Sequence, residues 1–124
     1  MCPLRHPGVS YGYRYEYEGK TLVYCTDVEH GEQIDPQVVS LACGADLLIH
    51  DAQYTPEELS HYKGWGHSSW LQAIQVAQMA GVKRLALFHH DPSHDDEFLL
   101  QEEKRCQAIF PAAFFAREGM EVVL

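Results

Sequence analysis

Tyrosine occupies every second position over residues 11–17, with glycine or charged residues between the rings. A period of two places the rings on one face of an extended strand, so this pattern predicts a β-strand. Residues 18–20 (Glu-Gly-Lys) predict a tight turn, and the apolar run over residues 21–25 is typical of a returning strand. The sequence therefore predicts a β-hairpin with one aromatic face.

Helix signals follow the hairpin, with a capping residue at each of four predicted starts and a glycine at two predicted ends. The starts are Asp35, Thr55, Ser68 or Ser69, and Ser93 (with Asp96 three residues later), and the glycines are Gly44 and Gly81. The last helix runs toward Ile109.

Short apolar runs at residues 47–49, 84–88 and 122–124 predict three further strands. A hairpin followed by alternating helices and strands predicts an α/β fold with a mixed sheet and helices on one face. The 124 residues are expected to form one domain over residues 1–124.

The formal charge of −9 opposes binding to a phosphate backbone, so we expect no long nucleic acid partner. No apolar run approaches the ~20 residues that span a bilayer, and residues 1–6 lack a signal-peptide core. We therefore expect a cytoplasmic protein that does not contact a membrane. The four cysteines have no C-x-x-C spacing, which predicts reduced and mostly buried thiols.

Histidine and aspartate gather near the predicted strand ends, an edge where α/β sheets bind ligands. The positions are His6, Asp27, His50-Asp51 and His89-His90-Asp91. His6, Asp27 and His89 offer two imidazoles and a carboxylate, a set that suits zinc, iron or manganese. A carboxylate can also bridge two cations about 3.5–4 Å apart, as in two-metal phosphoester hydrolysis. For each histidine taken singly, a purely structural role is the alternative.

Five ordered segments resemble motifs from the second half of the metallo-β-lactamase superfamily, in the branch that contains ribonuclease Z and small-substrate phosphodiesterases. They are residues 6–14 (HPGVSYGYR), 24–27 (YCTD), 49–54 (IHDAQY), 66–69 (GHSS) and 87–91 (LFHHD). The resemblance extends to the closing residues 116–124. It implies the C-terminal half of an αββα sandwich.

The same resemblance implies a role for each matching residue. His6 would complete the ligand set of one metal, Asp27 would bridge two metals, and His89 would be the last histidine ligand of the second. His67 resembles a histidine that assists proton transfer near the scissile phosphate, and Asp51 resembles the acid that orients it. The alternatives are a helix-leading residue for His67 and a solvated turn for Asp51. The implied cofactor is a divalent transition metal, zinc first, with manganese or iron as alternatives.

The His-x-His-x-Asp-His motif of the superfamily's N-terminal half does not occur in this sequence. Each metal would then keep one histidine and a share of Asp27, although a zinc site normally has three or four protein ligands. A mononuclear site is the alternative. We expect weak or no activity from the chain alone. Because a half-sandwich exposes an apolar face, we also expect a fragment of a longer protein, or pairing with an N-terminal half or a second copy.

The leading hypothesis is a module of a metal-dependent hydrolase. In its complete form this hydrolase would be a phosphodiesterase that acts on a small-molecule phosphoester. The directly joined hairpin supports this, because short-type ribonuclease Z often carries a tRNA-grasping insertion between these strands. A non-catalytic remnant that serves in binding or association is the first alternative, and a lactonase or thioesterase is another. Metal content and phosphodiester hydrolysis would separate the first two.

Other polar residues have simpler interpretations. Asp95, Asp96 and Glu97 fall in the first turn of a predicted helix, where negative charge favours the helix dipole. The roles of His90, Asp91 and His94 are left open by the sequence.

Overall fold

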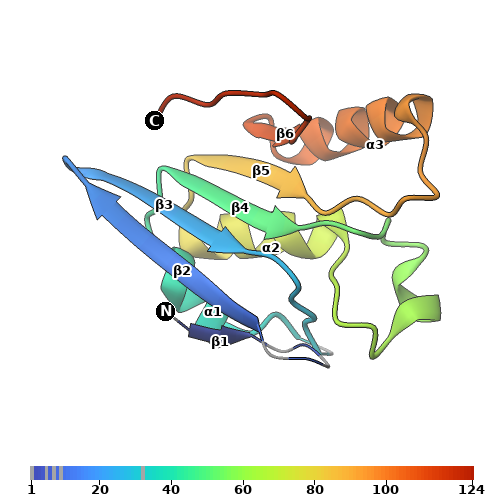
Figure 1. Cartoon of the computed structure of the whole chain (residues 1–124), viewed down its shortest axis with the longest axis horizontal. Helices are drawn as coiled ribbons and strands as arrows, with labels where there is room; N and C mark the ends of the chain where they lie inside the picture. Colours follow the sequence, from blue (N-terminus) through green and yellow to red (C-terminus); the bar gives the residue numbers. More distant parts are fainter. Residues whose placement is uncertain (1, 5, 7, 9, 32) are drawn as a thin grey trace.

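The six strands form one sheet in which strand order follows chain order (Figure 1). The computed structural model describes residues 2–4, 6, 8, 10–31 and 33–124. β1 and β2 pair antiparallel, as do β2 and β3, whereas β3 through β6 are parallel neighbours. The predicted mixed sheet is therefore confirmed. The strands are β1 (Cys2–Leu4), β2 (Ser10–Tyr17), β3 (Lys20–Cys25), β4 (Leu47–Asp51), β5 (Arg84–Phe88) and β6 (Ala113–Phe115).

The predicted hairpin forms with a two-residue turn. Tyr17 pairs with Lys20, and Glu18 and Gly19 between them both have positive φ angles, 50° and 77°. A two-residue turn with φ above zero at both positions matches the right-handed twist of the strands. β1, which pairs with the other edge of β2, was not predicted from sequence.

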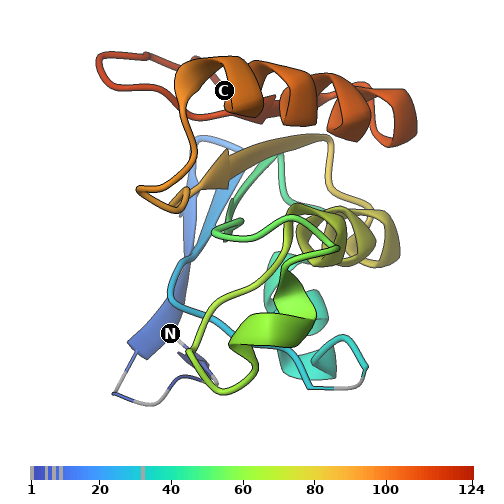
Figure 2. The ribbon, with the colours of Figure 1, turned by 90° about the vertical axis from the view of Figure 1, so that its right-hand side faces the viewer.

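Three α-helices cover one face of the sheet, as predicted (Figure 2). They are α1 (Pro36–Ala42), α2 (Trp70–Ala80) and α3 (Asp96–Ile109), and a 3₁₀ turn, η1, spans Leu59–Tyr62. The core lies between these helices and alternate strand residues, among them Val23, Leu48 and Leu87. This burial fixes which strand residues face the helices and leaves the strand ends free to carry polar side chains.

Two of the four predicted capping residues cap α-helices. Asp35 caps α1, and Ser69 forms a reciprocal capping box with Gln72 at the start of α2. Thr55 and Glu58 also make both capping-box hydrogen bonds, but only η1 follows them instead of an α-helix.

The opposite face of the sheet carries apolar side chains without a covering helix. Tyr24 and Phe88 are 36% and 39% exposed, and the segment after β6 brings Val122 and Leu124 over this face. The predicted strand at residues 122–124 is therefore wrong. A short apolar run has the same composition whether it pairs in a sheet or covers one, so periodicity cannot separate the two.

All four cysteines are free, as expected, but only Cys25 and Cys106 are buried. Burial raises the pKa of both of these thiols to about 12, which leaves them protonated and unreactive at neutral pH. Among the described residues, no helix has the length and apolar character needed to cross a membrane.

The N-cap of α3 is Asp95, which accepts a hydrogen bond from the Phe98 amide at 2.8 Å, and not Ser93 as the sequence predicted. We expect Asp95→Ala to lower the free energy of unfolding by about 1 kcal/mol, because that amide loses its acceptor. Ser93→Ala should change it by less than about 0.5 kcal/mol. Urea unfolding of both variants measures this, and equal losses would contradict the capping assignment.

Candidate active site

The candidate site lies at the carboxyl ends of β3, β4 and β5. Asp27 follows β3, Asp51 is the last residue of β4, and His89 follows β5. These parallel strands end on the same side of the sheet, toward which their arrows point to the right in Figure 1. Loops at this edge hold the remaining site residues, which is the usual ligand position in α/β sheets.

Four side chains converge there: one potential ligand atom from each of Asp27, Asp51, His67 and His89 lies within 4.8 Å of the others. The Asp27 carboxylate Oδ1 is 3.4 Å from His89 Nε2 and 3.8 Å from His67 Nδ1. The rings of His67 and His89 stack with centroids 4.6 Å apart. The strand ends indicated that Asp27, Asp51 and His89 would meet, and the loop before α2 adds His67 to them.

The backbone is strained at two of these four residues. Asp27 has φ 53° and His89 has φ 65°, both in the left-handed region that L-residues with a Cβ rarely adopt. Ser10 Oγ donates to the Asp27 carbonyl at 2.8 Å and helps to hold the first of these turns. Strain of this kind persists where the surrounding structure enforces it, and it clusters at functional sites.

The strain at His89 can be tested by comparing glycine with alanine. Left-handed backbone costs an L-residue about 1–2 kcal/mol, and glycine loses about 0.5–1 kcal/mol more than alanine on folding. We therefore expect metal-free His89→Gly to be more stable than His89→Ala by about 0.5–1 kcal/mol in urea unfolding. At His61, within η1, the order should reverse. The same order at both positions would contradict strain at residue 89.

Asp51 is a fully buried carboxylate that accepts hydrogen bonds from residues around the site. Its Oδ1 accepts from the amides of Gln53 at 3.1 Å and Ser68 at 3.2 Å, and its Oδ2 accepts from His67 Nδ1 at 2.7 Å. This last contact fixes Nδ1 as a protonated nitrogen of His67 and sets the orientation of the ring.

The charges around His67 favour its protonated form. Burial lowers the pKa of His67, but the hydrogen bond and charge of Asp51, with the charges of Asp27 and Glu29, outweigh it. The pKa is therefore raised above the ordinary value for histidine. A histidine in this setting can donate a proton near neutral pH.

His6 lies next to this cluster but outside the group of four. Its Nδ1 is 2.9 Å from the Gly66 carbonyl oxygen, and its ring meets the His67 ring edge to face with centroids 5.4 Å apart. Donation of the Nδ1 proton to that carbonyl leaves Nε2 as the nitrogen that could bind a metal.

The geometry fits a divalent metal on the Asp27–His89 side of the cluster. Two ligands of a tetrahedral zinc, each about 2.0–2.1 Å from the ion, lie about 3.4 Å apart, the separation seen here. His89 would bind through Nε2, the ring nitrogen that faces Asp27, and an imidazole nitrogen with a carboxylate oxygen is a donor pair that zinc accepts. Asp51 and His67 are instead bonded to each other.

Glu29 is a site residue that the sequence analysis missed. Its Oε1 accepts hydrogen bonds from the amides of Gly64 at 2.7 Å and Gly66 at 3.0 Å, which holds the loop just before His67. Nothing in the local sequence indicates this role, because the two glycines lie more than thirty positions further along the chain.

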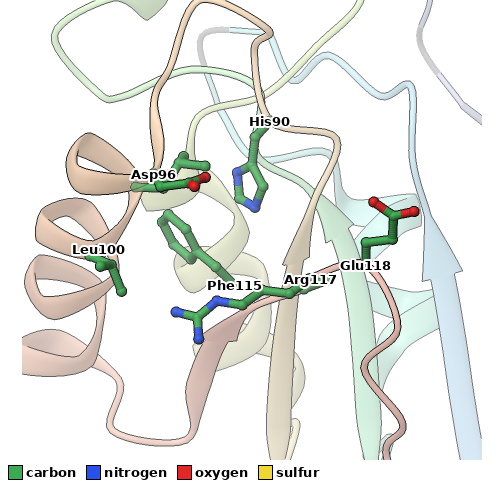
Figure 3. A pocket seen from close by; sticks show the side chains of 8 residues that line it. His90, Asp96, Leu100, Phe115, Arg117 and Glu118 are labelled. Atoms are coloured by element: carbon green, nitrogen blue, oxygen red, sulfur yellow. The ribbon is translucent and has the colours of Figure 1, made fainter.

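Four other histidines near these motifs have structural contacts. His50 is buried and bonds to the Asp51 carbonyl at 2.8 Å and to His30 at 3.2 Å. His94 pairs with Glu58 at 3.0 Å. His90 turns away from the cluster and stacks on Phe115, where it lines a cavity of about 410 Å³ beside α3 (Figure 3).

Asp91 also has a local role. Its Oδ1 accepts from the Ser93 amide at 2.9 Å, and its Oδ2 accepts from Gln53 Nε2 at 3.4 Å. These contacts hold the turn between β5 and α3. Asp91 is therefore a nearby carboxylate outside the four-residue cluster.

Comparisons with known proteins identify the family of this chain. The family model "Beta-lactamase superfamily domain" matches residues 3–90. Ribonuclease Z of Azobacteroides pseudotrichonymphae is 42% identical over 98 residues, which cover 78% of this chain and 32% of that protein. Ribonuclease Z of Synechococcus sp. is 36% identical over 125 residues, covering 98% of this chain and 35% of that protein. The chain spans about a third of the length of the curated relatives it matches.

Solved structures show the same fold. The metallo-β-lactamase fold protein YhfI from Bacillus subtilis superposes with TM-score 0.72 and 23% identity, over 95% of this chain and 46% of that one. Human tRNase Z, short form, superposes with TM-score 0.69 and 22% identity, over 95% of this chain and 39% of that one. The expected metallo-β-lactamase fold class is confirmed.

The relatives contradict the expectation of a small-molecule phosphoester and no nucleic acid partner, because the similar curated proteins are ribonucleases Z. The argument from net charge failed for a physical reason. The formal charge of −9 is the sum over a chain that covers about a third of the length of each relative. RNA binding depends instead on the local charge around the binding site.

Proposed function

Because the chain belongs to the β-lactamase superfamily, we propose that it forms part of a metal-dependent hydrolase that cleaves a phosphodiester bond in RNA. The observation that carries the proposal is the Asp51–His67 pair, held by a 2.7 Å hydrogen bond next to the Asp27–His89 pair. The ribonuclease Z relatives support RNA as the substrate.

The proposed roles follow from the contacts. Asp27, His89 and His6 would hold the metal, and a nitrogen and oxygen ligand set favours zinc. When bound, the metal supplies Lewis-acid polarisation of the phosphate and an activated water. His67 would protonate the leaving oxygen, and Asp51 would keep the His67 ring in the orientation and protonation state for that transfer.

These three ligand side chains suffice for one zinc at most, since a zinc site normally takes three or four protein ligands. We therefore expect the chain alone to cleave RNA slowly. The small number of ligands also favours a second candidate, a non-catalytic member of the family that binds a partner through the same fold.

One experiment separates the two functions. The purified chain is loaded with Zn²⁺ or Mn²⁺ and incubated with an end-labelled precursor tRNA, and His67→Ala is the matched variant. We expect metal-dependent cleavage that His67→Ala abolishes without loss of metal. A protein that retains no metal and leaves the RNA intact would instead favour the non-catalytic function.

A further inference from the structure

Trp65 is a large aromatic residue that stands exposed beside the proposed catalytic histidine. Its side chain is 62% exposed, and only Gly66 separates it from His67 along the chain. The other tryptophan, Trp70, is 3% exposed and packs in the core. An exposed indole beside such a site offers a face on which a nucleic-acid base could stack.

The loop that carries Trp65 is held on both sides. The amides of Gly64 and Gly66 donate to Glu29 Oε1, and the Trp65 amide donates to the Tyr62 carbonyl at 3.2 Å. The Gly66 carbonyl oxygen also lies 2.9 Å from His6 Nδ1. The two glycines have φ angles of 86° and 88°, which only glycine adopts easily. The backbone that carries the indole is therefore held in place on both sides.

Aromatic contacts link this indole to the site. Trp65 meets the Tyr62 ring edge to face, with centroids 5.4 Å apart, and Tyr62 stacks on Tyr54 at 4.5 Å and 6°. Tyr54 is buried and meets the His67 ring edge to face at 6.3 Å. Tyr54 thus contacts the imidazole directly and the indole through Tyr62, so one set of ring contacts links the two side chains.

We propose that Trp65 is a stacking platform for the base of a nucleotide next to the phosphate that is cleaved. This inference rests on the proposed function. Exposed Lys63 lies two residues before the indole, so a ring for a base and a cation for a phosphate occur together. Stacking on an aromatic side chain holds any base, because every base has a π-face.

The test measures binding of a fluorescein-labelled single-stranded oligoribonucleotide of about 12 nucleotides to the metal-free chain at fixed salt. Trp65→Ala should weaken binding by about tenfold to a hundredfold, whereas Trp65→Phe keeps a ring and should stay within about fivefold of wild type. Tyr17→Ala is the matched control. This residue is 77% exposed at the far end of the hairpin, and its loss should leave the dissociation constant unchanged.

A second measurement identifies the occupant of the platform. An abasic ribose is moved along the oligonucleotide, and at one position it should weaken binding to wild type but not to Trp65→Ala, because both changes remove the same stack. Base stacking should also quench the fluorescence of wild type and not that of Trp65→Phe, whose remaining Trp70 is buried.

The outcomes distinguish this inference from the proposed function. RNA that is bound and cleaved equally well by wild type and Trp65→Ala would overturn the platform and leave the proposed function standing. An abasic effect of equal size in both proteins would also overturn it, and would indicate that Trp65 packs against protein instead. Absence of RNA binding and cleavage by wild type would overturn both.

Discussion

Replacing Asp51 with asparagine should lower the rate of RNA cleavage by about 10²–10⁴-fold, the range that a correctly placed general acid contributes. In the carboxylate, Oδ1 accepts two backbone amides and Oδ2 accepts the His67 Nδ1 proton. Asparagine has one acceptor oxygen, so its amide group must face either the two backbone donors or His67. Either arrangement disturbs the ring, and loss of the negative charge removes the main stabilisation of the protonated form of His67.

The measurement is the single-turnover cleavage rate of labelled precursor tRNA, with metal content determined on the same samples. Asp91→Asn is the matched control, because Asp91 lies on the same edge but, within the described part of the chain, bonds to Ser93 and Gln53 and to no member of the cluster. We expect it to cleave within about threefold of wild type, since surface changes outside such networks have small effects. An Asp51→Asn rate close to that of Asp91→Asn would contradict the role given to the Asp51–His67 pair.

Much of the fold was predictable because local signals and tertiary structure agree. The alternating tyrosines and the turn at residues 18–20 predicted β2 and β3, and a cap at Ser68 or Ser69 with Gly81 at the end predicted α2 to within a residue. The errors arose where a local signal had two structural solutions. Residues 122–124 are apolar enough for a strand but lie across the sheet face, and Ser93 and Asp95 are both acceptable caps for α3.

The site was predictable to a different degree. The sequence order of strand ends indicated that Asp27, Asp51 and His89 would meet, and the structure places them in one cluster with His67. Their roles as ligands and proton donor stay predictions. The supporting contacts could not be predicted, because Glu29 binds amides far along the chain and the positive φ angles at Asp27 and His89 depend on tertiary packing.

Replacing Asp27 with alanine should weaken Zn²⁺ binding by more than about 100-fold. Loss of a residue that only hydrogen-bonds to a metal ligand costs about 10–100-fold, and loss of a ligand should cost more. Asp27 is the member of the cluster whose carboxylate faces both His89 and His67, at 3.4 and 3.8 Å. Its side chain is 40% exposed, so the loss should come from the missing ligand and not from unfolding. Competition with a zinc-binding dye measures the affinity, and His61→Ala and Asp91→Ala are matched controls for histidine and carboxylate.

The two substitutions together test whether Asp27 and His89 bind the metal while Asp51 and His67 transfer the proton. Asp27→Ala should lower both metal affinity and the rate of cleavage. Asp51→Asn should lower the rate of cleavage at unchanged metal affinity, because both Asp51 oxygens already accept hydrogen bonds from His67 and two backbone amides. If Asp51→Asn weakened Zn²⁺ binding as strongly as Asp27→Ala, the metal would lie between Asp51 and His67 instead. Their hydrogen bond would then have to break on metal binding, and His67 could not serve as the proton donor.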